Sequence, residues 1–387
     1  MLYYALIIII VIVIIIYSYI KIKYNFWIKQ NIYHTYDFWY YLFPRIIDND
    51  LPERENKYHN FKNIQTIKVS SLQEKIINKL TLFLENNFTK NNDNIIKYFP
   101  KKENIISYLI GLEGGESFIS FYKKERIQEN YKTSYELLGT ILSYPIQIII
   151  KNNSFNCYYI DYLCVDKNYR NKHIALELMQ THNYNQRYMN KNIIVSLFKR
   201  EKRLDIAIPL CEVSSYLYSI KEITCEKIPN NIKLIKVGKD NINHFYNFIK
   251  LNYYKFDIYI TISTANLLEL IKTENIIIYM LIQDVQIISV YYFKKSCNYV
   301  NERKEIYNCI GSLNCCLLED IFINGFNNAL INIKKDYNDF TYIMIENSSD
   351  NNKLINLTKK IIITKSFYYF HNLAYKKINA NNCLIII

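Results

Sequence analysis

The residues best suited to chemistry lie in one short stretch, residues 160–176, which reads IDYLCVDKNYRNKHIAL. An apolar, aromatic-rich run over 158–165 predicts a strand, and a second apolar run from Ile174 predicts the start of a helix. Between these two runs stand Arg170, Asn171, Lys172 and His173. A helix start offers unpaired N–H groups and a positive dipole end, and Arg170 and Lys172 would add charge beside it. The stretch therefore predicts a pyrophosphate-binding loop.

The composition narrows the classes of protein to which the chain can belong. The 387 residues are half hydrophobic, which is enough for a substantial core and for two or three domains. The net charge of +13 is spread along the chain, and no zinc-finger spacing or RNA-binding motif accompanies it, so we expect no nucleic-acid partner. The nine cysteines lack the spacing of a disulfide framework or a metal site. We therefore expect reduced thiols, a cytosolic environment and no bound metal.

The N-terminus has a different character from the rest of the chain. Residues 2–20 carry no charge and match the roughly 20 apolar residues that span a bilayer. Lys21 and Lys23 follow, which favours a cytoplasmic location for the residues after them. We predict that residues 1–23 form a transmembrane anchor with the catalytic region in the cytoplasm. A signal peptide and a buried segment remain alternatives.

The elements that must position the loop follow from periodicity. Residues 24–64 form an arm that contains both tryptophans. Apolar spacing then predicts two halves of similar order, 65–228 and 229–387, joined near 229–231. The expected helices are 70–88, 103–112, 171–189, 242–253, 265–271 and 317–335. The expected strands are 137–144, 146–150, 158–165, 193–197, 276–282, 287–293, 342–345, 367–375 and 384–387, with a bulge or break at Pro145.

Several motifs along the chain stand in a recognisable order. They are Tyr36-Asp37-Phe38-Trp39 with Pro44, Leu138-Gly139-Thr140-Ile141 with Pro145, Asp161-Tyr162-Leu163-Cys164-Val165 with the basic loop, and the late segments at 342–347 and 367–372. In this order they resemble the glycylpeptide N-myristoyltransferases. The resemblance implies an α+β fold of two fused acetyltransferase-like halves with mixed β-sheets and a pseudo-twofold relation. It also implies a monomer that transfers a long acyl group from myristoyl-CoA to the N-terminal glycine of proteins.

The resemblance also implies which residues bind and react. The backbone amides of Tyr162 and Leu163 would polarise the thioester carbonyl, and the carboxylate at Ile387 would act as the base. None of the six histidines stands in a hydrolase-like constellation, and the apolar end of the chain, 383–387, favours a buried terminus. The residues expected to contact CoA are Tyr36, Asp37, Phe38, Trp39, Tyr162, Leu163, Cys164, Val165, Arg170, Asn171, Lys172, His173, Ile174, Ala175 and Leu176.

The peptide side departs further from the family pattern. The residues expected to meet the peptide are Phe88, Asp93, Tyr98, Asp161, Tyr216 and Tyr218. Asp161 stands where the family has asparagine, the loop 88–94 keeps one carboxylate, and Tyr218 replaces a histidine. On the CoA side, His173 replaces an arginine. Two alternatives to the acyltransferase therefore stay open: a catalytically inactive acyl-CoA or peptide-binding scaffold, and a short-chain N-acetyltransferase.

Overall fold

The computed structural model describes residues 2–89, 96–127, 133–151, 153–301, 304–355 and 360–387. Its helices are α1 Leu2–Lys23, α2 Phe38–Leu42, α3 Glu74–Asn87, α4 Lys102–Ile106, α5 Ile174–Met189, α6 Ile242–Asn252, α7 Thr264–Lys272 and α8 Glu319–Asp336. Its strands are β1 Arg45–Ile46, β2 Ile64–Lys68, β3 Ile96–Tyr98, β4 Phe118–Ile127, β5 Thr133–Ile150, β6 Asn153–Val165, β7 Ser196–Arg200, β8 Cys211–Ser219, β9 Ile232–Lys236, β10 Ile258–Thr261, β11 Ile276–Gln283, β12 Gln286–Val300, β13 Lys304–Asn314, β14 Phe340–Glu346, β15 Ile362–His371, β16 Leu373–Ala374 and β17 Cys383–Ile386.

The two halves of the chain repeat one order of elements. In the first half the order is β2, α3, β3, α4, β4, β5, β6, α5, β7, and in the second it is β9, α6, β10, α7, β11, β12, β13, α8, β14. In each half an antiparallel hairpin pair leads to a strand, a crossover helix and a parallel strand, β6 to β7 and β13 to β14. The expected α+β class with a mixed sheet and a repeated unit is confirmed, and the join expected near 229–231 lies just before β9.

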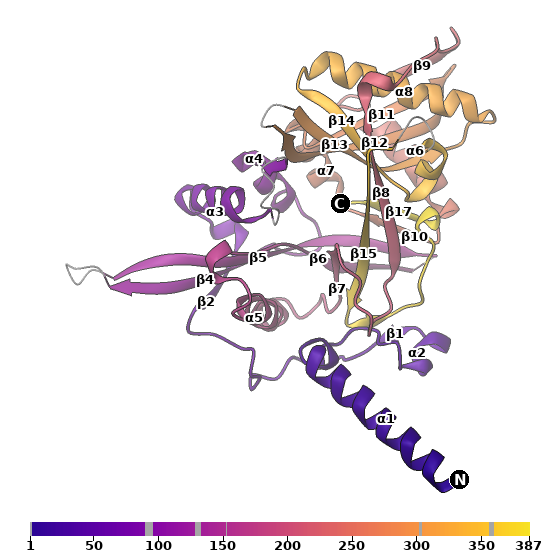
Figure 1. Cartoon of the computed structure of the whole chain (residues 1–387). Coiled ribbons are helices and arrows are strands. Elements are labelled where there is room, and N and C mark those ends of the chain that lie inside the picture. Colours follow the sequence, from indigo (N-terminus) through magenta and orange to yellow (C-terminus); the bar gives the residue numbers. More distant parts are fainter. Residues whose placement is uncertain (1, 90–95, 128–132, 152, 302–303, 356–359) are drawn as a thin grey trace.

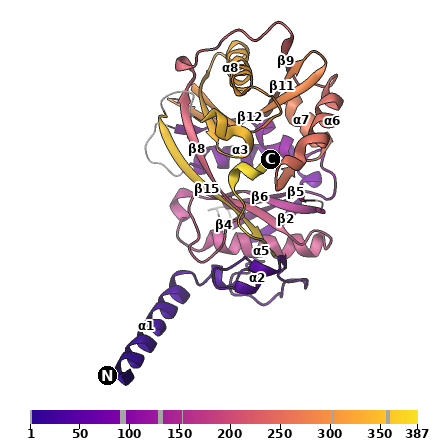
Figure 2. The same cartoon turned by 90° about the vertical axis from the view of Figure 1, so that its right-hand side faces the viewer.

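The halves share one continuous sheet because each half places one of its strands, β8 or β15, beside a strand of the other half. The order β7-β15-β8-β14 puts β15 of the second half beside β7 of the first, and β8 beside β14. The C-terminal strand β17 pairs in parallel with β10, which pairs in turn with β5 of the first half. The end of the chain therefore lies in the middle of the molecule, as Figures 1 and 2 show.

Helical periodicity explains how the crossover helices attach to the sheet. In α8, Phe322, Phe326, Leu330 and Ile333 share one face and are fully buried in the second core cluster. In α5, Ile174 and Leu178 face the sheet, and His182 bridges the hydroxyls of Ser120 and Ser143 at 2.8 and 2.9 Å. Burial lowers the pKa of His182 to about 3, so this histidine is a neutral structural residue.

Pro145 causes neither a bulge nor a break in its strand, contrary to our prediction. β5 runs without interruption from Thr133 to Ile150, and Pro145 pairs with Tyr158 of β6. On its other side β5 pairs with β4 up to Ser143 and with β10 from Gln147 onward. Pro145 lies in the gap between these two partners, so its lack of an N–H group costs no ladder hydrogen bond.

The N-terminal helix α1 stands away from the body of the molecule (Figures 1 and 2). Its most apolar stretch of 18 residues has a mean hydropathy of 2.9, and none of that stretch is buried. It is long and apolar enough to cross a membrane, although a signal sequence has the same properties.

Candidate active site

A β-bulge at Tyr162 and Leu163 forms the centre of the site. The pairing of β5 with β6 joins Leu142 to Asp161 and Thr140 to Cys164, so Tyr162 and Leu163 both lie opposite Ile141. A bulge takes its extra residue out of the ladder and re-aims the local backbone. Tyr162 accordingly has a left-handed φ of 49°. Pairing of β6 with β7 ends at Ile160, so the two strands part where the bulge begins. Backbone amides at such an opening can donate to a developing oxyanion.

Asp161 directly precedes this bulge, and its side chain bonds to the bulge backbone. Its carboxylate accepts a hydrogen bond from the Tyr162 amide at 2.7 Å. Burial raises the pKa of Asp161, and attraction from Lys294 and Lys199 opposes the rise. The Tyr162 hydroxyl donates or accepts across 3.3 Å with the Tyr98 hydroxyl, and the Phe88 ring lies 4.9 Å from the Tyr98 ring. The structure thus brings together three of the residues expected to meet a peptide, Phe88, Tyr98 and Asp161.

A cavity of about 570 Å³ runs from the bulge to the start of α5. Its walls are Asn87, Phe88, Leu163, Cys164, Val165, Tyr169, Arg170, Asn171, His173, Ile174, Ala175 and Leu176. The walls combine apolar side chains from β6 with the polar loop before the helix. The cavity therefore lies against the two features that the sequence predicted, the strand over 158–165 and the loop before the helix.

The loop before α5 exposes backbone amides because of its conformation. Asn171 and His173 have φ values of 63° and 61°, and α5 begins at Ile174, three residues later than predicted. His173 provides no side-chain cap, so the first amides of α5, at Ile174 and Ala175, have no acceptor within the helix. Successive free amides together with a helix dipole form an anion-binding site.

Arg170 ties this loop to the end of α3. Its guanidinium donates to the carbonyl of Asn87 at 2.6 Å and, at 3.5 Å, to the carbonyls of Thr89 and Val165. Lys172 lies with its ammonium 4.6 Å from the centre of the Tyr169 ring. Arg170 therefore lines the cavity and fixes the shape of the loop, whereas Lys172 contacts Tyr169, another residue of the cavity wall.

The end of the chain lies in the interior. Ile387 is 6% exposed, and its main-chain oxygen accepts a hydrogen bond from the Lys294 ammonium at 3.0 Å. Lys294 also lies 4.5 Å from the centre of the Tyr108 ring. The end of the chain is therefore buried, as predicted. The role of its carboxylate as a base stays a prediction.

A buried polar cluster surrounds this point, and sequence reasoning missed part of it. Lys199 and Glu346 form an ion pair of 2.7 Å between β7 and β14. Lys294 lies within β12, which continues seven residues beyond the predicted end at 293. The only signal for Lys294 was a pair of lysines directly after a strongly apolar strand, a pattern more typical of a strand that ends.

The aromatic arm lies apart from this cavity. Tyr36, Phe38 and Trp39 are 52%, 79% and 74% exposed, and none of them lines the cavity. The Asp37 carboxylate accepts from the His34 amide at 3.3 Å, and Tyr36 stacks on His34. The contact of the arm with CoA remains a prediction.

The remaining peptide-side residues are also apart from the bulge. Tyr218 is 1% exposed and donates to the carbonyl of Ile355, within the core cluster under α8. Tyr216 packs against the same cluster, and the Lys360 ammonium lies 4.6 Å from its ring centre. Asp93 lies outside the described residues.

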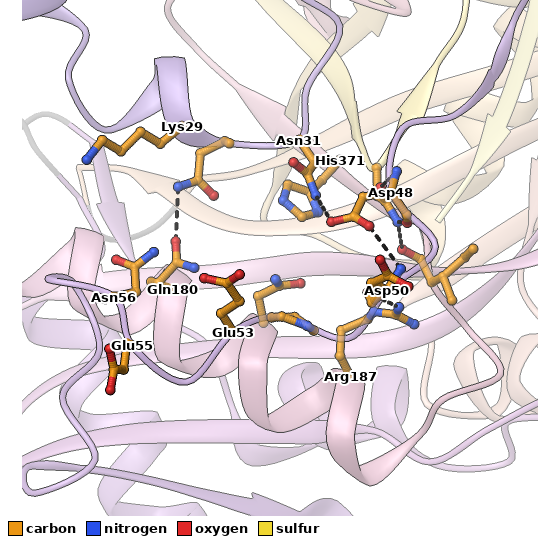
Figure 3. A pocket seen from close by; sticks show the side chains of 15 residues that line it. Lys29, Asn31, Asp48, Asp50, Glu53, Glu55, Asn56, Gln180, Arg187 and His371 are labelled. Atoms are coloured by element: carbon orange, nitrogen blue, oxygen red, sulfur yellow. Dashed lines mark hydrogen bonds between the residues drawn. The ribbon is translucent and has the colours of Figure 1, made fainter.

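A second, smaller cavity of about 190 Å³ lies between the arm and the C-terminal half of α5 (Figure 3). Asp48, Asp50, Glu53, Arg187 and His371 are among the residues around it. Its walls are almost entirely polar, and hydrogen bonds already connect several of them, including Asn31 to Asp48 at 3.3 Å. It does not suit an acyl chain. Among the described residues, no group of three or more His, Cys, Asp or Glu could hold a metal ion.

Comparisons with known proteins agree with this geometry. Residues 53–211 match the family described as "Myristoyl-CoA:protein N-myristoyltransferase, N-terminal domain". A protein of Amsacta moorei entomopoxvirus, "Putative glycylpeptide N-tetradecanoyltransferase", is 24% identical over 264 residues, which cover 63% of this chain and 87% of that protein.

The fold matches solved structures over nearly its whole length. Saccharomyces cerevisiae N-myristoyltransferase with bound myristoyl-CoA has a TM-score of 0.72 and 15% identity, with 92% of this chain and 94% of that chain covered. A second structure of the yeast enzyme, with myristoyl-CoA and inhibitors, also has a TM-score of 0.72 and 15% identity, and covers 92% of this chain and 91% of its own. The chain is therefore similar to the N-myristoyltransferases, in sequence over residues 53–211 and in fold over most of its length.

Proposed function

We propose that this protein transfers a long fatty acyl group, myristoyl in the first instance, from acyl-CoA to the N-terminal glycine amine of protein substrates. One observation carries the proposal. Leu163 of the bulge lines the 570 Å³ cavity together with Ile174 and Ala175 at the amide-rich start of α5. An acyl-CoA has a thioester carbonyl and a diphosphate separated by an extended linker, which is the arrangement that such a cavity would accommodate.

Each part of the cavity has a distinct task in this proposal. The amides of Ile174 and Ala175, with Arg170 and Lys172, would hold the phosphates by hydrogen bonds and charge. The amides of Tyr162 and Leu163 would stabilise the oxyanion of the tetrahedral intermediate, and a donor of this kind contributes about 10²–10³ in rate. The apolar side chains of β6 would exclude water from the thioester.

The same proposal includes attachment to a membrane through α1. Lys21 and Lys23 follow the apolar run, and basic residues favour the cytoplasmic side. The body of the protein would then act in the cytoplasm, close to the bilayer into which acylated products partition.

Transfer is tested by incubating the purified protein with myristoyl-CoA and a panel of peptides that begin with glycine. Mass spectrometry should detect myristoyl peptide, and the same peptides with an acetylated glycine should give none. Acetyl-CoA should compete poorly if the enzyme selects a long chain, and efficient acetyl transfer would favour the short-chain alternative.

A non-catalytic scaffold is the second candidate, favoured by the peptide side. Tyr218 is buried and hydrogen-bonded within the α8 cluster instead of facing the bulge. A scaffold would bind myristoyl-CoA with measurable affinity and leave the thioester intact in the presence of every peptide in the panel.

A further inference from the structure

The short helix α2 and the residue after it expose a contiguous group of large apolar side chains. Phe38 and Trp39 are largely exposed, and Tyr41, Leu42 and Phe43 are 67%, 62% and 64% exposed. Single exposed apolar residues are ordinary, whereas contiguous ones mark a surface that contacts something else. The resemblance assigns Phe38 and Trp39 to CoA, and it leaves Tyr41, Leu42 and Phe43 without a role.

The rest of the arm holds these side chains outward. Tyr40 is the half-buried member of α2, and its ring meets the buried Tyr33 ring edge to face at 6.0 Å. The Arg45 guanidinium lies 5.1 Å from the centre of the Tyr40 ring. Directly after α2, β1 pairs with β16 of the body. The segment is therefore fixed to the body on both sides of the apolar group, and the exposure of the group is a property of the fold.

The apolar group lies at the end of the body from which α1 extends. Figures 1 and 2 both place α2 there, with α8 at the opposite end of the molecule. The chain between α1 and α2 is also attached to the body: the Tyr24 hydroxyl donates to the Asp205 carboxylate at 2.5 Å, and the Phe26 ring packs against Tyr58 at 5.1 Å. The surface of a bilayer crossed by α1 would lie near the last turn of this helix, and α2 would face that surface.

The charges of this region suit an anionic lipid surface. Residues 1–45 contain four basic side chains, Lys21, Lys23, Lys29 and Arg45, and one acidic side chain, Asp37. Aromatic residues concentrate at the level of the lipid headgroups, and basic residues beside them attract anionic lipids. The combination of exposed aromatic rings, basic residues and an adjoining apolar helix favours a bilayer as the partner of this surface.

We propose that Tyr41, Leu42 and Phe43 insert into the headgroup region of the bilayer that α1 crosses. The inference rests on the proposed attachment through α1 and adds a second point of contact. Three side chains are too few to hold a protein on a membrane alone, so α1 remains the anchor. A single helix would leave the body free to tilt about its connection, and the second contact fixes which face of the body meets the lipid.

The two tryptophans of the chain can report on this contact because their surroundings differ. Trp39 stands in α2, whereas Trp27 stacks on the Phe198 ring at 5.9 Å with the Arg200 guanidinium 4.8 Å from its ring centre. Full-length Trp27→Phe therefore reports on α2, and Trp39→Phe reports on the body. Each protein is reconstituted into vesicles of roughly four parts phosphatidylcholine to one part phosphatidylserine. The phosphatidylcholine carries bromine atoms high on its acyl chains, or none.

We expect brominated lipid to reduce Trp39 emission by about 2-fold and Trp27 emission by less than about 1.2-fold, because a ring at the interface lies beside the bromine atoms. Leu42→Ser with Phe43→Ser, made in the Trp27→Phe protein, should remove most of this quenching. The matched control is Leu317→Ser with Leu318→Ser, which should leave the quenching unchanged. Both of these leucines are exposed directly before α8, at the end of the molecule opposite α1 (Figures 1 and 2).

Resistance of the protein to extraction by alkaline carbonate measures the insertion of α1 separately. Inserted protein whose Trp39 is not quenched would overturn the inference and leave the attachment through α1 intact. Trp39 emission that responds to the protein-to-lipid ratio or to added myristoyl-CoA, and not to bromine, would also overturn it, because a second copy or the CoA would then cover α2. Complete extraction by carbonate would refute the attachment on which the inference rests. These readouts do not involve acyl transfer, so a failure of the transferase is seen independently.

Discussion

Replacement of Arg170 by alanine tests whether the loop before α5 is the phosphate site. In the structure the guanidinium makes one short hydrogen bond, to the Asn87 carbonyl at 2.6 Å, and two at 3.5 Å that contribute little. A hydrogen bond to a charged group is worth about 1.5–3 kcal/mol. Loss of this tie should lower the free energy of unfolding by about 1–2 kcal/mol, because water can solvate carbonyls at the partly open loop.

The effect on binding should be larger than the effect on stability. Loss of one charge-assisted contact to a diphosphate, at about 1.5–3 kcal/mol, corresponds to a roughly 10- to 150-fold increase in the Kd of myristoyl-CoA. Titration of the protein with myristoyl-CoA and with S-myristoylpantetheine, which lacks the diphosphate, separates two mechanisms. Arg170→Ala should weaken the first ligand and leave the second nearly unchanged, and exposed Arg203→Ala should affect neither. An unchanged Kd for myristoyl-CoA in a folded Arg170→Ala variant would refute the assignment of the loop.

Three further predictions concern packing, pH and the anchor. Gly139→Val should lower the free energy of unfolding by about 1–3 kcal/mol in urea titrations. The reason is that a Cβ at Gly139 would lie 2.7 Å from the Leu178 side chain and 3.1 Å from the Cys164 carbonyl. An unchanged urea midpoint would show that α5 packs less closely on the bulge strand. Burial raises the pKa of Glu305 to about 7, so the folded state holds a proton that the unfolded state releases near pH 4. Stability should therefore fall by up to roughly 3 kcal/mol between about pH 4.5 and 7, and Glu305→Gln should flatten this dependence in chemical unfolding followed across that range. Deletion of residues 1–23 should move the protein from the membrane fraction to the soluble fraction with its myristoyl-CoA affinity unchanged, and persistence in the membrane fraction would contradict the role of α1 as the anchor.

Local patterns predicted much of the fold because they depend on residues close in sequence. The helices α3, α5, α6, α7 and α8 follow from apolar spacing, and their ends lie within a few residues of those expected. The repeated order of the two halves follows from the same patterns. The exchange of β8 and β15 between the halves depends on contacts between distant segments, which one sequence does not display.

The features of the site that depend on residue type could be predicted from the sequence. The features that depend on backbone geometry could not. Arg170 and Lys172 identified the loop by their charge, whereas the left-handed conformations of Asn171 and His173 that expose its amides could not be read from apolar spacing. The bulge at Tyr162 depends on the register against β5. Lys294 resembled a residue after a strand, and its partial burial follows only from the continuation of β12.

The most direct test of the account is a crystal structure with a non-hydrolysable ketone analogue of myristoyl-CoA. We expect the carbonyl oxygen within about 3 Å of the amides of Tyr162 and Leu163, with the diphosphate at Ile174 and Ala175. We also expect the Asp161 carboxylate to have left the Tyr162 amide, because that amide would then donate to the carbonyl oxygen. A carbonyl placed elsewhere, or a diphosphate remote from the start of α5, would contradict the proposed function.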